Sequence, residues 1–220
     1  MTTLSREVPI DPGHAALLII DVQNYCAHPH GAGSHPLDPQ QRHYLFDRLR
    51  QTVLPNLQLL QSACRHARIE VVYAAVENMT RDGRDRSLDY KISGIDVPCG
   101  SWDAQILVEI APAEDEMVFR KTSSSVFVST NVDYVLRNLG VRSLIVAGMM
   151  TDQCVESAVR DACDLGYLVT LISDACTTTS AERHEQSLIG IRGYCRQRTT
   201  NALFSEIAAL AAVDLTRRLT

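Results

Sequence analysis

Residues 15–20, Ala-Ala-Leu-Leu-Ile-Ile, form an apolar run that is bounded by Gly13 and Asp21. A short continuous apolar run between turn-forming residues is typical of a strand that is buried on both faces. Strands of this kind occur in parallel sheets, because helices cover both faces of such a sheet. The run therefore predicts one strand of a parallel sheet in an α/β protein.

Further strands and helices are predicted along the whole chain. The strand pattern recurs at residues 69–76, 116–120, 144–147, 167–172 and 194–198. Apolar residues at helical spacing occupy residues 40–67, 131–138, 151–165, 181–191 and 200–212. Pro55 is expected to kink or split the first of these helices, because proline lacks the amide hydrogen that a helix interior requires. This alternation predicts a parallel sheet with helices on both faces. No linker divides the chain, so residues 1–220 are predicted to form a single domain.

The composition excludes several functional classes. The chain has 220 residues, with 21 Lys and Arg against 26 Asp and Glu, and a formal net charge of −5. An acidic balance without a basic block argues against nucleic-acid binding. The apolar runs are too short to cross a membrane. Residues 1–12 lack the apolar stretch of a signal peptide, so we expect a cytoplasmic protein.

The seven cysteines are dispersed, and no two of them form a Cys-x-x-Cys pair. Zinc-ribbon and thioredoxin-type functions are therefore excluded. In a reducing compartment the cysteines are expected to be free thiols, most of them small buried side chains.

Three residues with catalytic potential lie where predicted strands end. Asp21 follows the first strand, Lys121 follows the third, and Cys154 lies just after the fourth at the start of a helix. In an open parallel sheet, ligands bind beyond the carboxyl ends of the strands. We therefore expect an acid, a base and a thiol to meet at one edge of the sheet.

These residue types suit nucleophilic catalysis. A thiol near a helix N-terminus is expected to have a lowered pKa, and a neighbouring lysine favours the thiolate further. A carboxylate nearby takes the thiol proton and passes it to a leaving group, while the amides that open the helix form an oxyanion hole. A structural alternative exists for each residue. Cys154 would be a small buried side chain, Asp21 a turn cap and Lys121 a solvated strand end.

The motifs around these residues extend over most of the chain. They are Leu17-Leu-Ile-Ile-Asp21-Val-Gln-Asn24, then Phe119-Arg-Lys121, then Gly148-Met-Met-Thr151-Asp-Gln-Cys154-Val155. In this order, and over roughly residues 14–200, the chain resembles the isochorismatase-like cysteine hydrolase superfamily, in particular its amidohydrolase branch. The resemblance implies a three-layer α/β/α, doubly wound fold with a mostly parallel, six-stranded sheet.

The resemblance also implies a role for each residue. Cys154 is the nucleophile, and Asp21 is the general base that then protonates the leaving group. Lys121 holds the thiolate and orients Asp21. A cis peptide bond is expected between Met150 and Thr151, where it turns amides such as that of Cys154 toward the substrate oxygen. This set favours an amidohydrolase that cleaves the C–N bond of a small amide or ureide through a Cys154 thioester.

A metal is not expected. The nicotinamidases of the superfamily bind one through an Asp-x-His element after the second strand, whereas the corresponding residues 76–84 contain no histidine. We therefore predict neither a metal nor another cofactor. His28, His30 and His35 cluster in the first loop and would suit zinc, but a Pro- and Gly-rich surface segment favours solvated histidines.

The substrate pocket is expected in the long irregular segments 22–39 and 77–101, because loops of that length are often functional. Asn24 and Tyr25 follow Asp21 closely and are expected to line the pocket. Trp102 and Phe127 are expected to form its walls, with a role in the core as the alternative.

Residues 193–200 are unusually polar for a segment near a strand end. Ureido-type hydrolases of the superfamily place polar side chains around a small polar substrate, so Gln197 or Arg196 would contact a carbonyl or carboxylate group. The alternative is an exposed final strand.

Two other functions remain open. One is the vinyl-ether hydrolysis of isochorismatase itself, and the other is a non-catalytic binding role for the fold. The expected partners are a small amide or ureide and further copies of the chain in a homodimer or homotetramer. The apolar helices at 153–165 and 200–212 would serve the contacts between copies. No nucleic acid or membrane partner is expected.

Overall fold

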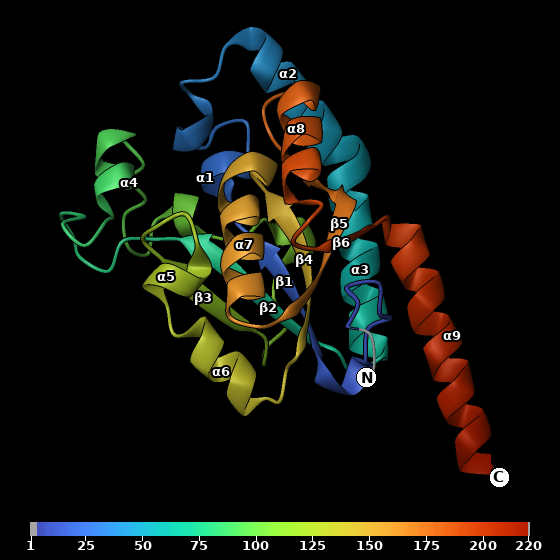
Figure 1. The fold of residues 1–220 in the computed structure, drawn as a ribbon. Helices are drawn as coiled ribbons and strands as arrows, with labels where there is room; N and C mark the ends of the chain where they lie inside the picture. Colours follow the sequence, from blue (N-terminus) through green and yellow to red (C-terminus); the bar gives the residue numbers. More distant parts are fainter. Residues whose placement is uncertain (1–3, 220) are drawn as a thin grey trace.

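Six strands form one sheet in the computed structural model, which describes residues 4–219 and the side chains of residues 4–210 (Figure 1). The strands are β1 (Ala15–Ile20), β2 (Glu70–Val76), β3 (Met117–Lys121), β4 (Ser143–Met149), β5 (Leu168–Thr177) and β6 (Arg196–Arg198). Their order across the sheet is β3-β2-β1-β4-β5-β6, and each neighbouring pair is parallel. The predicted doubly wound parallel sheet is confirmed.

Helices cover both faces of this sheet. They are α1 (Asn24–Ala27), α2 (Pro39–Arg48), α3 (Leu54–His66), α4 (Leu88–Ile92), α5 (Val126–Ser129), α6 (Val132–Asn138), α7 (Glu156–Asp164), α8 (Ala181–Ile191) and α9 (Thr200–Leu219). Figure 1 shows α3 and α9 on one side of the sheet and α5, α6 and α7 on the other. The predicted three-layer α/β/α architecture is therefore confirmed.

The first long helix is divided close to Pro55. A π-helical turn, Leu49–Val53, joins α2 to α3, and the amide of Leu54 donates to the carbonyl oxygen of Leu49. Proline cannot continue the regular hydrogen-bond pattern of a helix, and the wider turn lies directly before it. The helix is therefore interrupted near Pro55 by a π-helical turn, while residues 39–66 stay helical throughout.

Strand β1 lies inside the sheet between β2 and β4, and all its side chains are buried. Its last residue, Ile20, lies opposite Gly148 of β4. Gly148 has a φ of +124°, and a Cβ atom there would lie 2.1 Å from the carbonyl oxygen of Ile20. Only glycine fits this approach, which brings Asp21 next to the turn that follows β4.

Strand β5 bulges beside the end of β4, where the register of the two strands shifts between Val146 and Gly148. Arg48, at the end of α2, holds the bulge. Its Nε donates to the carbonyl oxygen of Cys176 at 3.2 Å, and its Nη2 donates to that of Ser173 at 3.4 Å. Bulges often occur beside active sites, where they redirect a strand end.

The same arginine supports the turn after β4 through a histidine. Arg48 Nη2 lies 3.0 Å from His184 Nε2, and His184 Nδ1 lies 2.9 Å from Thr151 Oγ1. A guanidinium only donates hydrogen bonds, so Nε2 accepts and Nδ1 carries the proton that is donated to Thr151. Burial and the charge of Arg48 lower the pKa of His184 to about 4, so the ring is neutral near pH 7. Helices α2 and α8 thus fix the first residue of the turn that carries Cys154.

We predict that Gly148→Ala destabilises the protein far more than Gly166→Ala. Both glycines have positive φ angles, +124° and +92°, but a Cβ atom at Gly166 would meet nothing within 4 Å. The Gly166 variant carries only backbone strain, about 1–3 kcal/mol. The Gly148 variant adds a clash with the backbone of β1, for a total loss above about 4 kcal/mol. Urea unfolding measures both losses, and equal values would contradict the close approach of β1 and β4.

We also predict that acid destabilises the wild-type protein more than the His184→Gln variant. In the unfolded chain a histidine binds a proton near its ordinary pKa of 6.5, whereas folded His184 binds one only near pH 4. Its contribution to stability is therefore complete above pH 6.5 and is lost as the pH falls toward 4, by at most about 3 kcal/mol. Thermal unfolding across this pH range tests the prediction, and parallel curves for the two proteins would refute it.

Candidate active site

The carboxyl ends of three strands bring Asp21, Lys121 and Cys154 together. Lys121 Nζ lies 2.9 Å from Asp21 Oδ2 and 3.4 Å from Cys154 Sγ. Strand β2 lies between β3 and β1, so the long lysine side chain spans the end of β2 to reach the carboxylate. The three residues that the sequence places at strand ends therefore form one cluster.

This cluster is almost closed to solvent. The exposed fractions are 0% for Lys121, 3% for Asp21 and 8% for Cys154. A buried ammonium needs acceptors and negative charge around it, and Lys121 also donates to Tyr90 Oη and to the carbonyl oxygen of Ser123, each at 3.0 Å. Of the three clustered residues Cys154 is the most accessible, although it too is buried.

Asp21 directs one carboxylate oxygen at Lys121 and leaves the other unpaired. The residue has a φ of +54°, which is uncommon for a non-glycine residue, and its amide donates to the carbonyl oxygen of Ala74 at 2.9 Å. Among the described residues, the buried Oδ1 has no hydrogen-bond partner. Such atoms are rare in folded proteins, so this oxygen is available to accept a proton from a neighbouring group.

The charges of the cluster follow from burial and proximity. Burial raises the pKa of the Asp21 carboxyl, and the Lys121 ammonium opposes this shift. Burial also disfavours the charge on Lys121, but Asp21 and Cys154 outweigh it and raise the lysine pKa well above its ordinary value. Burial and the Asp21 carboxylate raise the pKa of Cys154 to about 12. The 2.9 Å contact between Lys121 Nζ and Asp21 Oδ2 fits an ammonium–carboxylate pair, and the raised pKa of Cys154 keeps its thiol neutral.

The expected lowering of the Cys154 pKa is wrong. The thiol does lie in a helical turn and beside a lysine, but it is also buried and next to a carboxylate. A thiolate there would place a second negative charge beside Asp21 in a poorly solvated site. The proton therefore stays on sulfur until a base removes it.

The chain turns sharply between β4 and α7. Strand β4 pairs with β5 as far as Met149, and Thr151 already begins a π-helical turn, Thr151–Val155. The cis peptide bond joins Met149 to Met150, so the expected position between Met150 and Thr151 is wrong by one residue. The carbonyl oxygen of Met150 accepts the amides of Gln153 and Val155 in this turn.

Tyr90 belongs to the cluster, although the sequence analysis did not identify it. It lies on α4, is 1% exposed, and places its hydroxyl 3.7 Å from Cys154 Sγ. The irregular segment that contains it is long enough to suggest a functional loop. A lone aromatic residue in such a segment has no periodic pattern that would single it out.

Three of the predicted substrate-binding residues lie together near this cluster. Asn24 Nδ2 donates to the carbonyl oxygen of Trp102 at 2.9 Å, and Tyr25 packs against the small apolar cluster that holds Tyr90. Trp102 is 46% exposed, and its ring meets that of His28 edge to face at 4.9 Å. Asn24, Tyr25 and Trp102 therefore lie on the side of the site formed by α1 and residues 102–104.

The other two predicted substrate contacts have structural roles. The ring of Phe127 packs against that of Tyr167 at 6.0 Å, which fits the core alternative. Gln197 pairs with Leu171 on the edge strand β6, and its Nε2 donates to the carbonyl oxygen of Leu188 at 2.6 Å. Because β4 and β5 separate β6 from β1, the structure places Gln197 away from the cluster of Asp21, Lys121 and Cys154.

Arg196 is also a structural residue, and it is buried rather than exposed on a final strand. Its Nη1 and Nη2 donate to the carboxylate of Glu206 at 2.8 and 2.9 Å, and its Nε donates to Thr170 Oγ1 at 3.1 Å. Glu206 also accepts the amide of Ile10 at 2.8 Å. The polar residues near the end of the chain thus join β6, α9 and the N-terminal segment.

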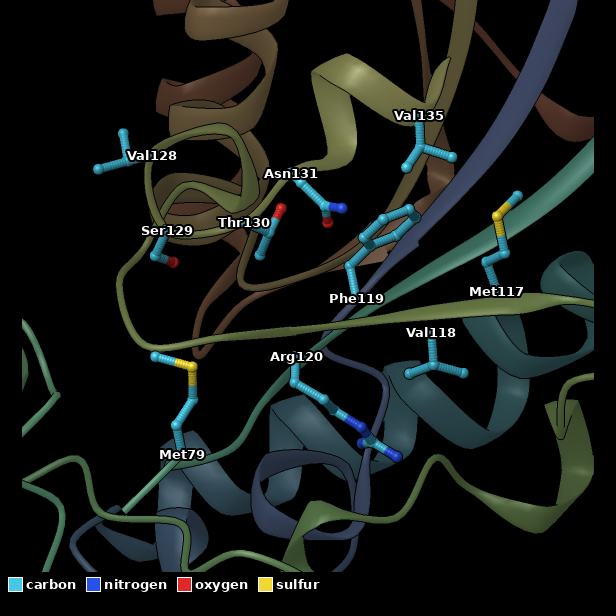
Figure 2. A pocket seen from close by; sticks show the side chains of 10 residues that line it. All are labelled: Met79, Met117, Val118, Phe119, Arg120, Val128, Ser129, Thr130, Asn131 and Val135. Atoms are coloured by element: carbon cyan, nitrogen blue, oxygen red, sulfur yellow. The ribbon is translucent and has the colours of Figure 1, made fainter. Parts of the chain in front are cut away.

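A separate groove follows the edge strand β3 (Figure 2). It has a volume of about 760 Å³ and is lined by Met79, Met117, Val118, Phe119, Arg120, Val128, Ser129, Thr130, Asn131 and Val135. Figure 2 shows these side chains around the strand and the segment that contains α5. Asp21, Lys121 and Cys154 do not line it, so the groove is distinct from the cluster.

Within the described part of the chain, no three His, Cys, Asp or Glu side chains gather closely enough to hold a metal ion. His28 instead packs against the rings of His30 and Trp102. The helices of residues 4–219 include none that combines the length and the apolar character needed to cross a membrane.

Comparison with known proteins identifies relatives of this fold. The model of the isochorismatase domain matches residues 15–202. A cysteine hydrolase from Pseudomonas syringae pv. phaseolicola 1448A has a TM-score of 0.80 and 24% identity, over 95% of this chain and 99% of that chain. An isochorismatase family protein from Desulfovibrio vulgaris has a TM-score of 0.74 and 25% identity, over 89% and 98%. The N-carbamoylsarcosine amidase from Thermoplasma acidophilum has a TM-score of 0.67 and 20% identity, over 84% and 96%.

The match to the domain model is the decisive comparison, because it spans most of the chain and contains Asp21, Lys121 and Cys154. The structural matches agree with it, since they share the fold over nearly the full length of each partner. This chain therefore belongs to the isochorismatase family.

Proposed function

We propose that the protein is an amidohydrolase that cleaves the C–N bond of a small amide or ureide through a thioester on Cys154. One observation carries the proposal: the Cys154 thiol lies beside a buried Lys121–Asp21 pair whose Oδ1 has no partner in the described residues. The Asp21 carboxyl group and the Cys154 thiol are close enough to shift each other's pKa, so the nucleophile lies near its base. The name of the Thermoplasma relative, an N-carbamoylsarcosine amidase, supports a C–N bond as the target.

The first half of the reaction forms the thioester. Asp21 accepts the thiol proton while the sulfur attacks the carbonyl carbon, and the electron pair of the C=O bond moves to oxygen. Amides that begin the turn Thr151–Val155 donate to this oxygen. The intermediate then expels its nitrogen, which takes the proton from Asp21 and leaves as ammonia or an amine. Lys121 stays protonated throughout and stabilises the thiolate as it forms.

The second half returns the enzyme to its resting state. Water gives a proton to Asp21 and attacks the thioester carbonyl carbon. The C–S bond breaks, and the sulfur takes the proton back from Asp21. The product leaves as a carboxylic or carbamic acid. The near-complete burial of the three residues fits a small substrate, because little room surrounds the sulfur.

Cys154→Ala should abolish hydrolysis without unfolding the protein. We expect ammonia release to fall by at least about 10³-fold, since the nucleophile is lost. The assay compares biuret, ureidoacrylate, N-carbamoyl amino acids and nicotinamide, with isochorismate as the vinyl-ether alternative. Cys163→Ala is the matched control, because Cys163 lies elsewhere and its Sγ contacts the carbonyl oxygen of Tyr194. A fully active Cys154→Ala variant would overturn the proposal.

Asp21→Asn should change turnover and thiol reactivity in opposite directions. Because the carboxylate raises the Cys154 pKa, its removal lowers that pKa and increases the thiolate fraction. We therefore expect alkylation of Cys154 near pH 8 to become about tenfold faster. Turnover should fall by about 10²–10⁴-fold, because the general base is missing. Slower alkylation in Asp21→Asn would show that the carboxylate does not hold the proton on sulfur.

A further inference from the structure

The hydroxyl group of Tyr90 contacts the reacting sulfur, yet the reaction described above does not use it. We propose that Tyr90 is a further catalytic residue, whose hydroxyl donates a hydrogen bond to Cys154 Sγ when the sulfur carries negative charge. The inference rests on the proposed function for the role of Cys154. Its other support is the set of contacts around one buried hydroxyl.

The direction of these hydrogen bonds follows from Lys121. Lys121 Nζ lies 3.0 Å from Tyr90 Oη, and an ammonium only donates, so the tyrosine oxygen is the acceptor of that bond. The hydroxyl proton must then point toward a different acceptor. Cys154 Sγ, at 3.7 Å from Oη, is the acceptor that the described contacts provide.

The ammonium group of Lys121 cannot donate a hydrogen bond to all its neighbours at once. An ammonium has three protons, and the acceptors around Nζ are Asp21 Oδ2 at 2.9 Å, Tyr90 Oη and the carbonyl oxygen of Ser123 at 3.0 Å, and Cys154 Sγ at 3.4 Å. The sulfur is the most distant of these acceptors. Once Asp21 has taken the thiol proton, its carboxyl group is neutral and attracts the Lys121 ammonium less strongly. A proton of Lys121 then turns to the thiolate. Tyr90 then supplies a second donor that Lys121 cannot replace.

The placement of Tyr90 also points to chemistry rather than packing. Of the residues on α4 it alone is buried, while Leu88 and Ile92 are 73% and 76% exposed. Figure 1 shows α4 standing out at the edge of the molecule, and the ring of Tyr90 reaches inward to pack with Val76 and Val97. A phenylalanine ring would pack equally well at this position. Burial of a hydroxyl group costs free energy unless the group is hydrogen-bonded, so packing alone does not explain a tyrosine here.

The hydrogen bond favours the charged form of the sulfur. Hydrogen bonds to a charged group are roughly twice as strong as neutral ones, so Tyr90 stabilises the thiolate more than the thiol. The same bond assists when the thioester collapses and the thiolate leaves. Burial raises the pKa of the Tyr90 hydroxyl, so it donates without losing its proton, and no proton transfer is assigned to it.

Alkylation of Cys154 by iodoacetamide tests this role without any substrate. The rate is measured against pH for the wild type and Tyr90→Phe, with peptide mass spectrometry to separate Cys154 from the other cysteines, of which Cys99 is exposed. We expect Tyr90→Phe to react about tenfold more slowly at each pH below the thiol pKa, because one hydrogen bond to the thiolate is missing. Tyr73→Phe is the control, since it removes a buried hydroxyl that contacts Gln61 and Glu116 instead. It should react at the wild-type rate.

The outcomes separate the role of Tyr90 from the proposed reaction. An alkylation rate in Tyr90→Phe that equals or exceeds the wild-type rate overturns the inference, as does an equal slowing in Tyr73→Phe. Slower alkylation together with a lower kcat and an unchanged KM supports it. Slower alkylation in a protein that hydrolyses no amide or ureide supports the role of Tyr90 and refutes the proposed reaction.

Discussion

A lysine ammonium without contact to solvent must be surrounded by acceptors and matched by negative charge, and the candidate site is organised around this constraint. Lys121 supplies the charge, Asp21 balances it at 2.9 Å, and Tyr90, Ser123 and Cys154 complete the surroundings. These residues come from segments that are far apart in the chain. Loss of any one partner would leave a charge or a hydrogen-bonding group unmatched in a poorly solvated place. The segments that carry these partners are therefore held together by their contacts with the Lys121 ammonium.

The sheet makes this arrangement possible. Parallel strands end at the same edge, and the order β3-β2-β1-β4 places β2 between the lysine and the aspartate. Lysine is long enough to span that strand. On the other side, the close approach of β4 to β1 brings Cys154 toward the carboxylate. The turn that carries Cys154 is supported by the hydrogen bonds from Arg48 to His184 and from His184 to Thr151. The general fold thus sets the distances on which the chemistry depends.

The sequence predicts most of the fold because strands buried on both faces have a strong apolar pattern. Asp21 and Cys154 could be found because each follows such a strand, and Lys121 because it ends the shorter, partly exposed strand β3. The pKa of Cys154 could not be predicted, since its burial and its neighbouring carboxylate arise from tertiary structure. Tyr90 lies in a segment without periodicity. The polar character of Arg196 suggested a ligand, but its partner Glu206 lies on a helix whose position the sequence does not reveal.

The contact between Gly148 and Ile20 has a consequence for how this chain can evolve. A Cβ atom at Gly94 or Gly100 would meet nothing within 4 Å, whereas at Gly148 it would meet the backbone of the central strand. Mutations in neighbouring side chains cannot compensate, because no side chain forms the obstacle. Room would come only from moving β4 away from β1, and that would also separate Cys154 from Asp21. A lineage that loses this glycine can keep every catalytic side chain and still lose the spacing between them.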